Sequence, residues 1–328
     1  MRFLLTDEQR EFARSLDALA TAADTPAAVR AWAAGDHGPG LALWRRLAEA
    51  GVFALAVPEA YGGVGPLPVE VAVACVELGR HGVPGPVVES VAAGVLLGGV
   101  GGPVAKEWLP RIAGGTGVVS LAMEGYGPYA LDADVADAVF TVTGDELRLT
   151  RGAVERTPSV DPARRLFRPA PGGELVAAGA RVHEAARAAG TWAAFATAAQ
   201  ALGCGEELLR ATVAYVKQRT QFGVPVGSFQ AVKHRLADTL LGLEFARPLL
   251  YGAAAELADG APEAGAAVAA AKVAAGEAGY AAARTALQLH GAVGYTEELD
   301  LAWWLRRARP LRDAWGTPSA CRARVLEG

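Results

Sequence analysis

The strongest structural pattern in the sequence is a pair of amphipathic helices joined by a tight turn, between residues 208 and 243. In the first helix, apolar side chains recur mostly at spacings of three to four: Leu208, Leu209, Val213 and Val216. Glycine and proline at 223, 225 and 227 then interrupt the helical pattern. Ser228 is expected to cap the second helix, because its hydroxyl can accept a hydrogen bond from a free backbone N–H group. The predicted apolar stripe of that helix is Phe229, Val232, Leu236, Leu240 and Leu243.

The turn carries polar side chains that suit an anionic ligand. Arg219 and Gln221 stand where one helix ends and the next begins, close to N–H groups that have no helical partner. Such N–H groups and a guanidinium together favour a phosphate-bearing ligand. A solvated arginine and a turn glutamine without any ligand are the alternative, and these residues alone do not separate the two.

Two longer motifs contain this turn and a second segment downstream. The first is Arg219-Thr220-Gln221-Phe222-Gly223 followed by residues 227–234, and the second is residues 288–296, Gln-Leu-His-Gly-Ala-Val-Gly-Tyr-Thr. Both, in this order, resemble the flavin-dependent acyl-CoA dehydrogenase family. The resemblance implies that both segments reach across a dimer interface to the ADP half of the FAD bound by the partner. The cofactor-binding residues it implies are Arg219, Gln221, Phe222, Gln230, Gln288, Gly291 and Ala292.

We expect a mainly α-helical fold with a small β-domain. Thr6 and Gln9 form a capping box, and apolar periodicity predicts further helices up to about residue 113. From residue 117 the period changes toward two, which predicts strands over 118–122, 138–142 and 146–150. Helices are predicted again over 183–218 and after residues 228, 262 and 299. The resemblance implies an N-terminal helical domain (1–116), a shortened middle β-domain (117–182) and a C-terminal four-helix bundle (183–328).

The composition excludes several functional classes. The net charge of −4 and the lack of a basic block argue against nucleic acid as a partner. The most apolar long stretch, residues 266–283, contains Lys272 and Glu277 and is rich in alanine, so we expect a closely packed helix and no membrane span. The cysteines at 75, 204 and 321 are far apart, which predicts reduced thiols and no metal site. With no secretory signal visible at the N-terminus, these features predict a cytoplasmic protein.

Three further features of the sequence are expected to be structural. Residues 154–165 are rich in turn formers, and we expect a solvated loop there in preference to an anion site at Asp161 and Arg164-Arg165. His234 and His290 are expected to lie in packed turns and not to act as acid–base groups. The pair Trp303-Trp304 is expected in the core or at an interface.

The sequence departs from the family where a subunit binds its own flavin and performs chemistry. Family members carry a Thr-Glu-Pro-x-x-Gly-Ser-Asp segment that holds their own FAD, whereas residues 123–130 here are Met-Glu-Gly-Tyr-Gly-Pro-Tyr-Ala. The family reaction also needs a glutamate base to remove the α-proton of an acyl-CoA thioester. Counting from the motifs, its two family positions hold Trp315 and Ala193, so no catalytic residue is assigned. The possible replacement carboxylates are Asp313, expected to point away from residue 315, and Glu184, Glu206 and Glu207.

These features together favour a subunit of a heteromer. A partner chain would carry the base and most of the flavin pocket, and this chain would complete the partner's FAD site. The sequence resembles the small subunits of actinobacterial steroid-catabolic acyl-CoA dehydrogenases, which implies an α2β2 heterotetramer, a bulky acyl-CoA substrate and an electron-transfer flavoprotein as acceptor. Two alternatives stay open: an active homo-oligomer with a relocated carboxylate base, and a flavin-free structural or regulatory relative.

Overall fold

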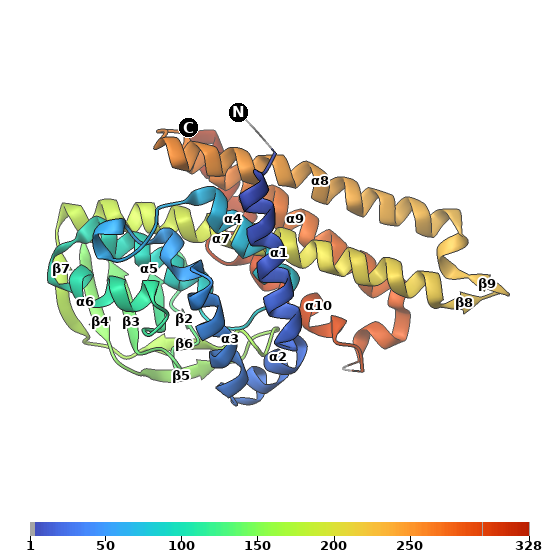
Figure 1. Ribbon diagram of the computed structural model, residues 1–328, viewed down its shortest axis with the longest axis horizontal. Helices are drawn as coiled ribbons and strands as arrows, with labels where there is room; N and C mark the ends of the chain where they lie inside the picture. The colour runs from blue at the N-terminus through green and yellow to red at the C-terminus, as the bar shows by residue number, and fades with distance from the viewer. Residues whose placement is uncertain (1–3, 297, 328) are drawn as a thin grey trace.

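The computed structural model describes residues 4–296 and 298–327, with residues 153 and 154 described by backbone alone. Residues 1–3, at the end of the chain where no secretory signal is predicted, lie outside the described residues. The chain begins as a helical layer (Figure 1). Its elements are α1 (Asp7–Ala22), α2 (Thr25–Ala34), α3 (Gly38–Glu49), η1 (Val52–Ala56), η2 (Glu59–Tyr61), α4 (Pro68–Arg80), α5 (Val87–Val100) and α6 (Gly102–Ala113). The predicted capping box is confirmed at the start of α1, where Thr6 and Gln9 bond each other's backbone N–H groups.

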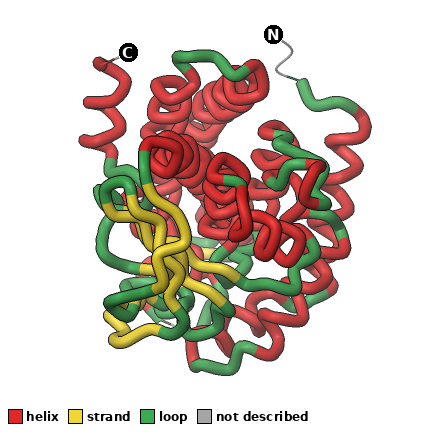
Figure 2. Tube along the Cα trace, turned by 90° about the vertical axis from the view of Figure 1, so that its left-hand side faces the viewer, coloured by secondary structure: helices red, strands yellow, loops and turns green. Residues whose placement is uncertain are grey.

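The strands between residues 119 and 178 form two small sheets grouped on one side of the molecule (Figure 2). They are β1 (Val119–Met123), β2 (Ala130–Leu131), β3 (Ala138–Thr143), β4 (Glu146–Thr150), β5 (Ala153–Thr157), β6 (Leu166–Pro169) and β7 (Glu174–Ala178). One sheet has the order β1-β3-β4-β7, with β1 parallel to β3, and the other has the order β2-β6-β5. The three predicted strands are confirmed within one residue at each end.

Long helices form the C-terminal part, as predicted. They are α7 (Ala180–Gln218), α8 (Gln230–Asp259), α9 (Ala264–His290), α10 (Leu301–Asp313) and α11 (Pro318–Glu327), with the short elements β8 (Thr220–Gln221), β9 (Val224–Pro225), η3 (Val226–Ser228) and η4 (Gly291–Tyr295) between them. Helix α7 crosses α4 so closely that a Cβ atom added to Gly203 would lie 1.9 Å from the Val76 carbonyl oxygen. Small residues along α7 therefore let the bundle pack directly on the N-terminal layer.

The element types change close to the predicted domain boundaries. Helices end at Ala113, strands run from Val119 to Ala178, and helices resume at Ala180. The mainly helical fold with a small β-region is confirmed. The division into domains ending at residues 116 and 182 stays a prediction.

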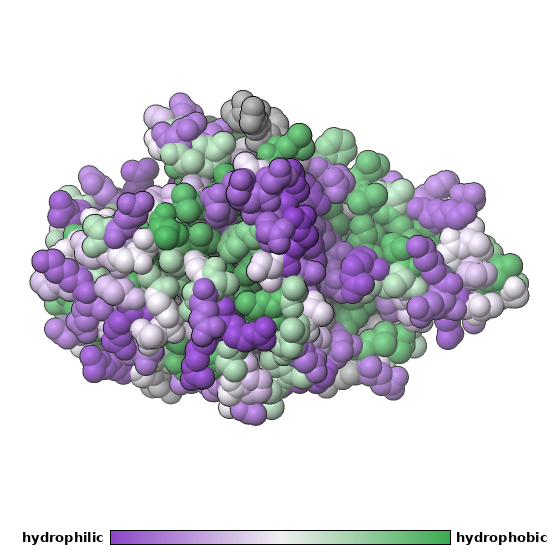
Figure 3. Space-filling view, viewed as in Figure 1, coloured by the Kyte–Doolittle hydropathy of each residue, from purple (hydrophilic) through white to green (hydrophobic). Residues whose placement is uncertain are grey.

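One expectation for α8 is wrong, and the predicted apolar stripe is only partly buried. Ser228 does not cap the helix: its hydroxyl donates to the Pro225 carbonyl (2.7 Å), and Phe229 is the N-cap without a side-chain bond. Within the predicted apolar stripe only Leu243 is buried, whereas Leu240 is 48% exposed. The helix packs on α9 along one side, and apolar side chains on its other side face outward: Leu240, Leu241, Phe245 and Leu249. Figure 3 shows hydrophobic side chains along the upper edge, where α8 runs in Figure 1.

The solvated loop expected over residues 154–165 is also wrong. Residues 153–157 form β5, and Asp161 is fully buried. One oxygen of its carboxylate accepts from Arg307 Nε of α10 at 2.7 Å, while Arg165 is buried against Asp134. The partner of Asp161 lies 146 positions away, so turn-forming residues nearby could not reveal this contact.

Other expectations for individual residues had mixed outcomes. The three cysteines are free and buried, as predicted. Trp304 is buried, Trp303 is half-buried, and His290 is packed at the end of α9, whereas His234 is exposed on α8 and the expectation of a packed turn is wrong for it. Among the described residues, we find no helix with the length and hydrophobicity needed to cross a membrane.

Candidate functional site

The first motif forms a protruding hairpin between α7 and α8, at the right-hand end of the molecule in Figure 1. Arg219 ends α7: its N–H group donates to the Tyr215 carbonyl (2.9 Å), and its carbonyl accepts from Val226 (2.7 Å). Strands β8 and β9 then pair across Phe222 and Gly223, whose φ angles are 53° and 79°. Positive φ at both central residues matches the turn that suits a two-residue hairpin, and glycine adopts it without strain. We call this hairpin, from Arg219 to Pro225, the arginine corner.

The second motif lies beside the arginine corner. Helix α9 ends at His290, and Gly291 turns the chain with a φ of 64°. The imidazole of His290 stacks on the ring of Tyr215 from α7, with centroids 4.1 Å apart and an interplanar angle of 22°. This contact fixes the end of α9 against the end of α7. Segments about 70 residues apart in the sequence, as the resemblance requires, therefore meet at one end of the bundle.

The seven predicted cofactor-binding residues are all exposed. Phe222 is the extreme case, with 93% of its surface accessible. The Gln221 amide donates to the neighbouring Thr220 carbonyl at 2.9 Å. The other long polar side chains, Arg219, Gln230 and Gln288, make no hydrogen bond or ion pair to any residue within 4–296 or 298–327. Two pockets, of about 840 and 590 Å³, lie elsewhere in the molecule, and none of these residues lines either of them. The free N–H donors of Arg219, Gln230 and Gln288 are therefore available to a ligand or a partner outside the chain.

A pocket of about 590 Å³ lies between the β-region and the end of α10, where one family position for the base is found. Trp315, which occupies a family base position, is 8% exposed and has a φ of 54°. Its indole Nε1 donates to Glu89 Oε1 (3.0 Å), and its ring centroid is 5.2 Å from that of Tyr126. Ala193, at the second base position, is fully buried in α7. Neither side chain can accept a proton.

Glu89 is the residue of this pocket that sequence reasoning missed. It lies on α5, is 3% exposed, and its Oε2 atom has no hydrogen-bond partner in the described chain. Burial raises the pKa of the Glu89 carboxyl, opposed by the nearby charge of Arg164 and by the bond from Trp315. The available signal was a single carboxylate in the apolar run 87–97, because a buried glutamate is rare unless it is paired or functional.

Of the four possible replacement carboxylates, two are paired with arginines away from the pocket, one is exposed, and only Asp313 lines the pocket. Glu206 pairs with Arg80 and Arg247, and Glu207 pairs with Arg210. Glu184 is exposed on α7. Asp313 lines the same pocket as Trp315, so the expectation that it points away is wrong. Helix α10 ends at Asp313, and Ala314 is extended, so helical geometry does not relate residues 313 and 315.

The turn that carries Trp315 is held by a buried lysine. Lys272 Nζ from α9 donates to the carbonyls of Leu311 (3.0 Å), Arg312 (2.8 Å) and Gly316 (3.3 Å). Desolvation lowers the pKa of Lys272 to about 8. These bonds satisfy carbonyls at the end of α10 that have no helical partner, so the position of Trp315 is built into the bundle.

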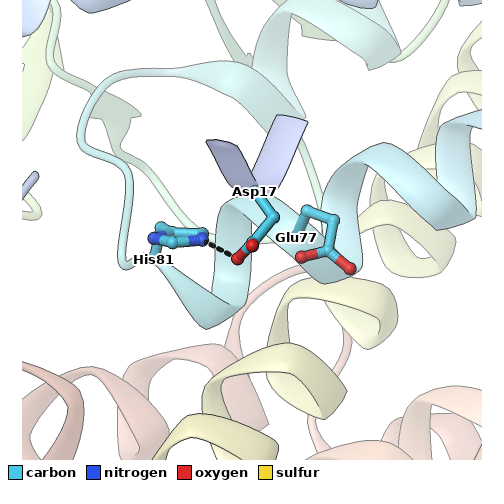
Figure 4. A group of neighbouring side chains, drawn as sticks. All are labelled: Asp17, Glu77 and His81. Carbon is cyan, nitrogen blue, oxygen red and sulfur yellow. Dashed lines mark hydrogen bonds and ion pairs between the residues drawn. The ribbon is translucent and has the colours of Figure 1, made fainter. Parts of the chain in front are cut away.

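A cluster of possible metal ligands lies away from both places. Asp17 stands between His81 and Glu77, with His81 Nε2 2.8 Å from Asp17 Oδ1 (Figure 4). The sequence did not suggest it because Asp17 and His81 are 64 positions apart. Arg80 lies against Glu77 (3.0 Å), so its guanidinium already supplies the positive charge that a metal ion would bring. Burial raises the pKa of Glu77 to about 7, and we assign the cluster no function.

Comparisons with known proteins agree with this geometry. Residues 6–116 match the N-terminal domain of acyl-CoA dehydrogenases, and residues 184–327 match the C-terminal domain. Acyl-CoA dehydrogenase IpdE2 of Mycobacterium tuberculosis is 36% identical over 86% of this chain and 85% of its own length. IpdE2 of Mycolicibacterium smegmatis is 33% identical over 95% of this chain and 96% of its own.

Solved structures agree with these relatives. The Tcur3481-Tcur3483 steroid ACAD G363A variant superposes with a TM-score of 0.85 at 25% identity, covering 98% of this chain and 97% of that one. The ChsE4-ChsE5 complex from Mycobacterium tuberculosis superposes with a TM-score of 0.83 at 27% identity, covering 100% of this chain and 98% of that one. The chain therefore belongs to the acyl-CoA dehydrogenase family.

Proposed function

We propose that the chain is a subunit of a heteromeric, FAD-dependent acyl-CoA dehydrogenase, in which it completes the FAD site of a partner subunit and supplies no base. The observation that carries this proposal is the contrast between the exposed, unpartnered Arg219 and the buried Trp315. Two structural relatives support a second subunit, since ChsE4-ChsE5 is a complex and the steroid ACAD carries two protein names. The outward apolar face of α8 also suits a subunit interface, because such faces are uncommon on monomers.

The arginine corner suits the anionic half of FAD. A guanidinium at the end of α7 and the amides of Gln230 and Gln288 are free to donate to pyrophosphate or adenosine. The chain's own pocket suits FAD poorly. The turn at residues 124–128 contains no serine or threonine, and the Glu124 carboxylate within it already accepts from the Gly144 N–H group at 2.8 Å. The negative charge of the Glu124 carboxylate would also repel a phosphate placed beside this turn.

The reaction requires removal of the α-proton of the thioester by a positioned carboxylate in a dry site. When bound, FAD would accept the hydride that leaves the β-carbon. Because Trp315 and Ala193 cannot accept the proton, the base would come from the partner. This chain would contribute binding and orientation of the cofactor, which can account for a large share of a rate enhancement.

The substrate class and the cellular setting follow from relatives. We propose a bulky acyl-CoA thioester, such as a sterol side-chain CoA ester, because one structural relative is named a steroid ACAD. An α2β2 heterotetramer, an electron-transfer flavoprotein as acceptor and a cytoplasmic location belong to the same proposal. No contact with nucleic acid or a membrane is needed for it.

The test is to express the chain alone and together with a second acyl-CoA dehydrogenase subunit from the same organism, and to record the visible spectrum and FAD content of each. We expect a colourless chain alone and a yellow, active complex. A yellow chain that dehydrogenates acyl-CoA without a partner would contradict the proposal and support the active homo-oligomer. A complex that stays free of flavin would support the structural or regulatory relative instead.

A further inference from the structure

The pocket beside Trp315 has no role in the proposed function, although its size suits a small molecule. Its volume of about 590 Å³ lies within the range of about 300–1,000 Å³ that is usual for ligand sites. It is lined by side chains from four parts of the chain, among them Glu89, Met123, Tyr126, Tyr129, Arg164 and Trp315. Because none of its residues belongs to the arginine corner, a ligand could bind here whether or not the corner binds FAD.

Aromatic rings form the walls of the pocket. The rings of Tyr126 and Trp315 lie 5.2 Å apart at an angle of 46°, and the ring of Tyr129 carries the Arg168 guanidinium at 5.2 Å. Tyr126 reaches back to α7 because Gly190 leaves space: a Cβ atom there would lie 2.4 Å from the tyrosine hydroxyl oxygen. Rings fixed in this way favour a flat, apolar ligand body.

The polar end of the pocket is incomplete. Glu89 Oε1 accepts from Trp315, but the buried Oε2 has no partner, which is costly for a buried polar atom. Arg164 is half-buried, and its guanidinium makes no hydrogen bond or ion pair in the described part of the chain. The charge of Arg164 acts on Glu89, yet the two do not form an ion pair. A polar group placed between them would satisfy both.

We propose that this pocket binds a flat, apolar carboxylate, with its carboxylate between Arg164 and Glu89 and its ring body against Tyr126 and Trp315. A planar carboxylate matches the guanidinium fork and accepts charge-assisted hydrogen bonds from it. When protonated, Glu89 would donate the remaining hydrogen bond through Oε2, and burial shifts the pKa of its carboxyl in the direction that favours this form. A phosphate fits less well than a carboxylate, because its larger negative charge would exceed the single positive charge of Arg164 and would lie beside the carboxyl group of Glu89.

The test is calorimetric titration of the full chain, with its partner if the chain needs one, using sodium 2-naphthoate as the probe. We expect one site per chain. Arg164→Gln should weaken binding about tenfold or more, because a charge-assisted hydrogen bond is lost. Arg309→Gln is the matched control, expected to change binding less than about twofold. Arg309 lines the same pocket, but its side chain is 58% exposed and paired with Asp313.

Variants at Glu89 test the hydrogen bond from its carboxyl group. Glu89→Gln keeps a donor and should retain binding within about threefold, whereas Glu89→Leu should weaken it about tenfold. Absence of saturable binding at millimolar 2-naphthoate, equal effects of the two arginine variants, or equally tight binding of uncharged 2-naphthol would each overturn the proposal. Melting temperatures check folding, and if Glu89→Leu does not fold, the arginine pair and 2-naphthol still decide. FAD content of the same samples keeps this result separate from the FAD proposal.

Discussion

The arginine corner and the Trp315 pocket derive from the same family fold but differ in how their side chains are used. At the corner, Arg219, Gln230 and Gln288 are exposed and have no partner in the described chain. In the pocket, Trp315 is 8% exposed and bonded to Glu89, and Lys272 fixes the turn beneath it. A side chain kept free in solution loses conformational entropy only when its ligand arrives, whereas a buried one contributes to folding. The difference indicates that the corner acts on something outside the chain, whereas Trp315 and Glu89 are buried and stabilise their own chain.

The two regions should therefore respond to substitution in different measurements. Substitutions around the pocket should lower the free energy of unfolding. Substitutions at the corner should leave stability unchanged and lower FAD binding by the complex. A corner variant that lowered stability, or a pocket variant that lowered FAD binding without lowering stability, would show that the two regions are not separate in function.

The buried ion pair beside the pocket should be the most sensitive position. Asp161 accepts from Arg307 at 2.7 Å, and both side chains are buried, being 0% and 8% exposed. Asp161→Ala leaves the guanidinium without its counter-charge and should lower the free energy of unfolding by about 3–5 kcal/mol. Chemical denaturation measures this. Glu146→Gln breaks a surface pair with Arg148 and should change stability by less than about 1 kcal/mol. Equal losses of stability in Asp161→Ala and Glu146→Gln would show that the buried ion pair does not stabilise the chain more than a surface pair does.

Arg219 should affect the cofactor and not the fold. In the assembled complex, Arg219→Gln would remove the charge-assisted hydrogen bonds to the pyrophosphate that we propose, and it should weaken FAD binding about tenfold to hundredfold. Titration of the FAD-free complex with FAD measures this, and thermal unfolding of the isolated chain should change little because residue 219 is exposed. Lys217→Gln, an exposed cation in the last turn of the same helix, is the control. If both variants bind FAD equally well, the corner does not contact the cofactor.

The sequence predicts what local patterns determine, and it misses contacts made between distant segments. Strong apolar periodicity predicts the helices of the bundle. The residue types at positions 315 and 193, tryptophan and alanine, are enough to show that neither can act as a base. The pair of Asp161 with Arg307 spans 146 positions, and no local pattern reveals it. Asp313 enters the pocket only because α10 ends there.

The stripe of α8 shows a different limit. Periodicity identifies apolar positions along the helix, but it does not say whether each position meets this chain or another one. Leu243 is buried against the bundle, whereas Leu240, on the same predicted stripe, is 48% exposed. A single sequence therefore predicts amphipathicity without identifying what covers it.

Trp315 should be structural and not catalytic in the complex. Trp315→Phe removes the hydrogen bond to Glu89 and leaves both carboxyl oxygens of that buried residue without a partner, which should cost about 1–2 kcal/mol of stability. Turnover by the complex should stay within about twofold, provided that the base lies in the partner. Trp303→Phe is the control, since the Trp303 indole makes no hydrogen bond in the described chain. Loss of turnover in Trp315→Phe alone would place this pocket in the chemistry.

The smallest effect concerns pH and comes from Lys272. Burial in the folded chain lowers the pKa of this amine from its ordinary value of 10.5 to about 8, so between those values the unfolded chain holds more protons. The free energy of unfolding contributed by Lys272 must then rise with pH in that window. Subtracting the stability of Lys272→Met from that of the unsubstituted protein should give a difference that increases by about 1 kcal/mol from about pH 8.5 to about pH 9.5. Cys321 cannot produce this slope, because burial raises the pKa of its thiol and a raised thiol pKa makes stability fall as pH rises. Parallel curves for the two proteins would mean that Lys272 keeps its proton throughout, and that three carbonyl partners outweigh its desolvation.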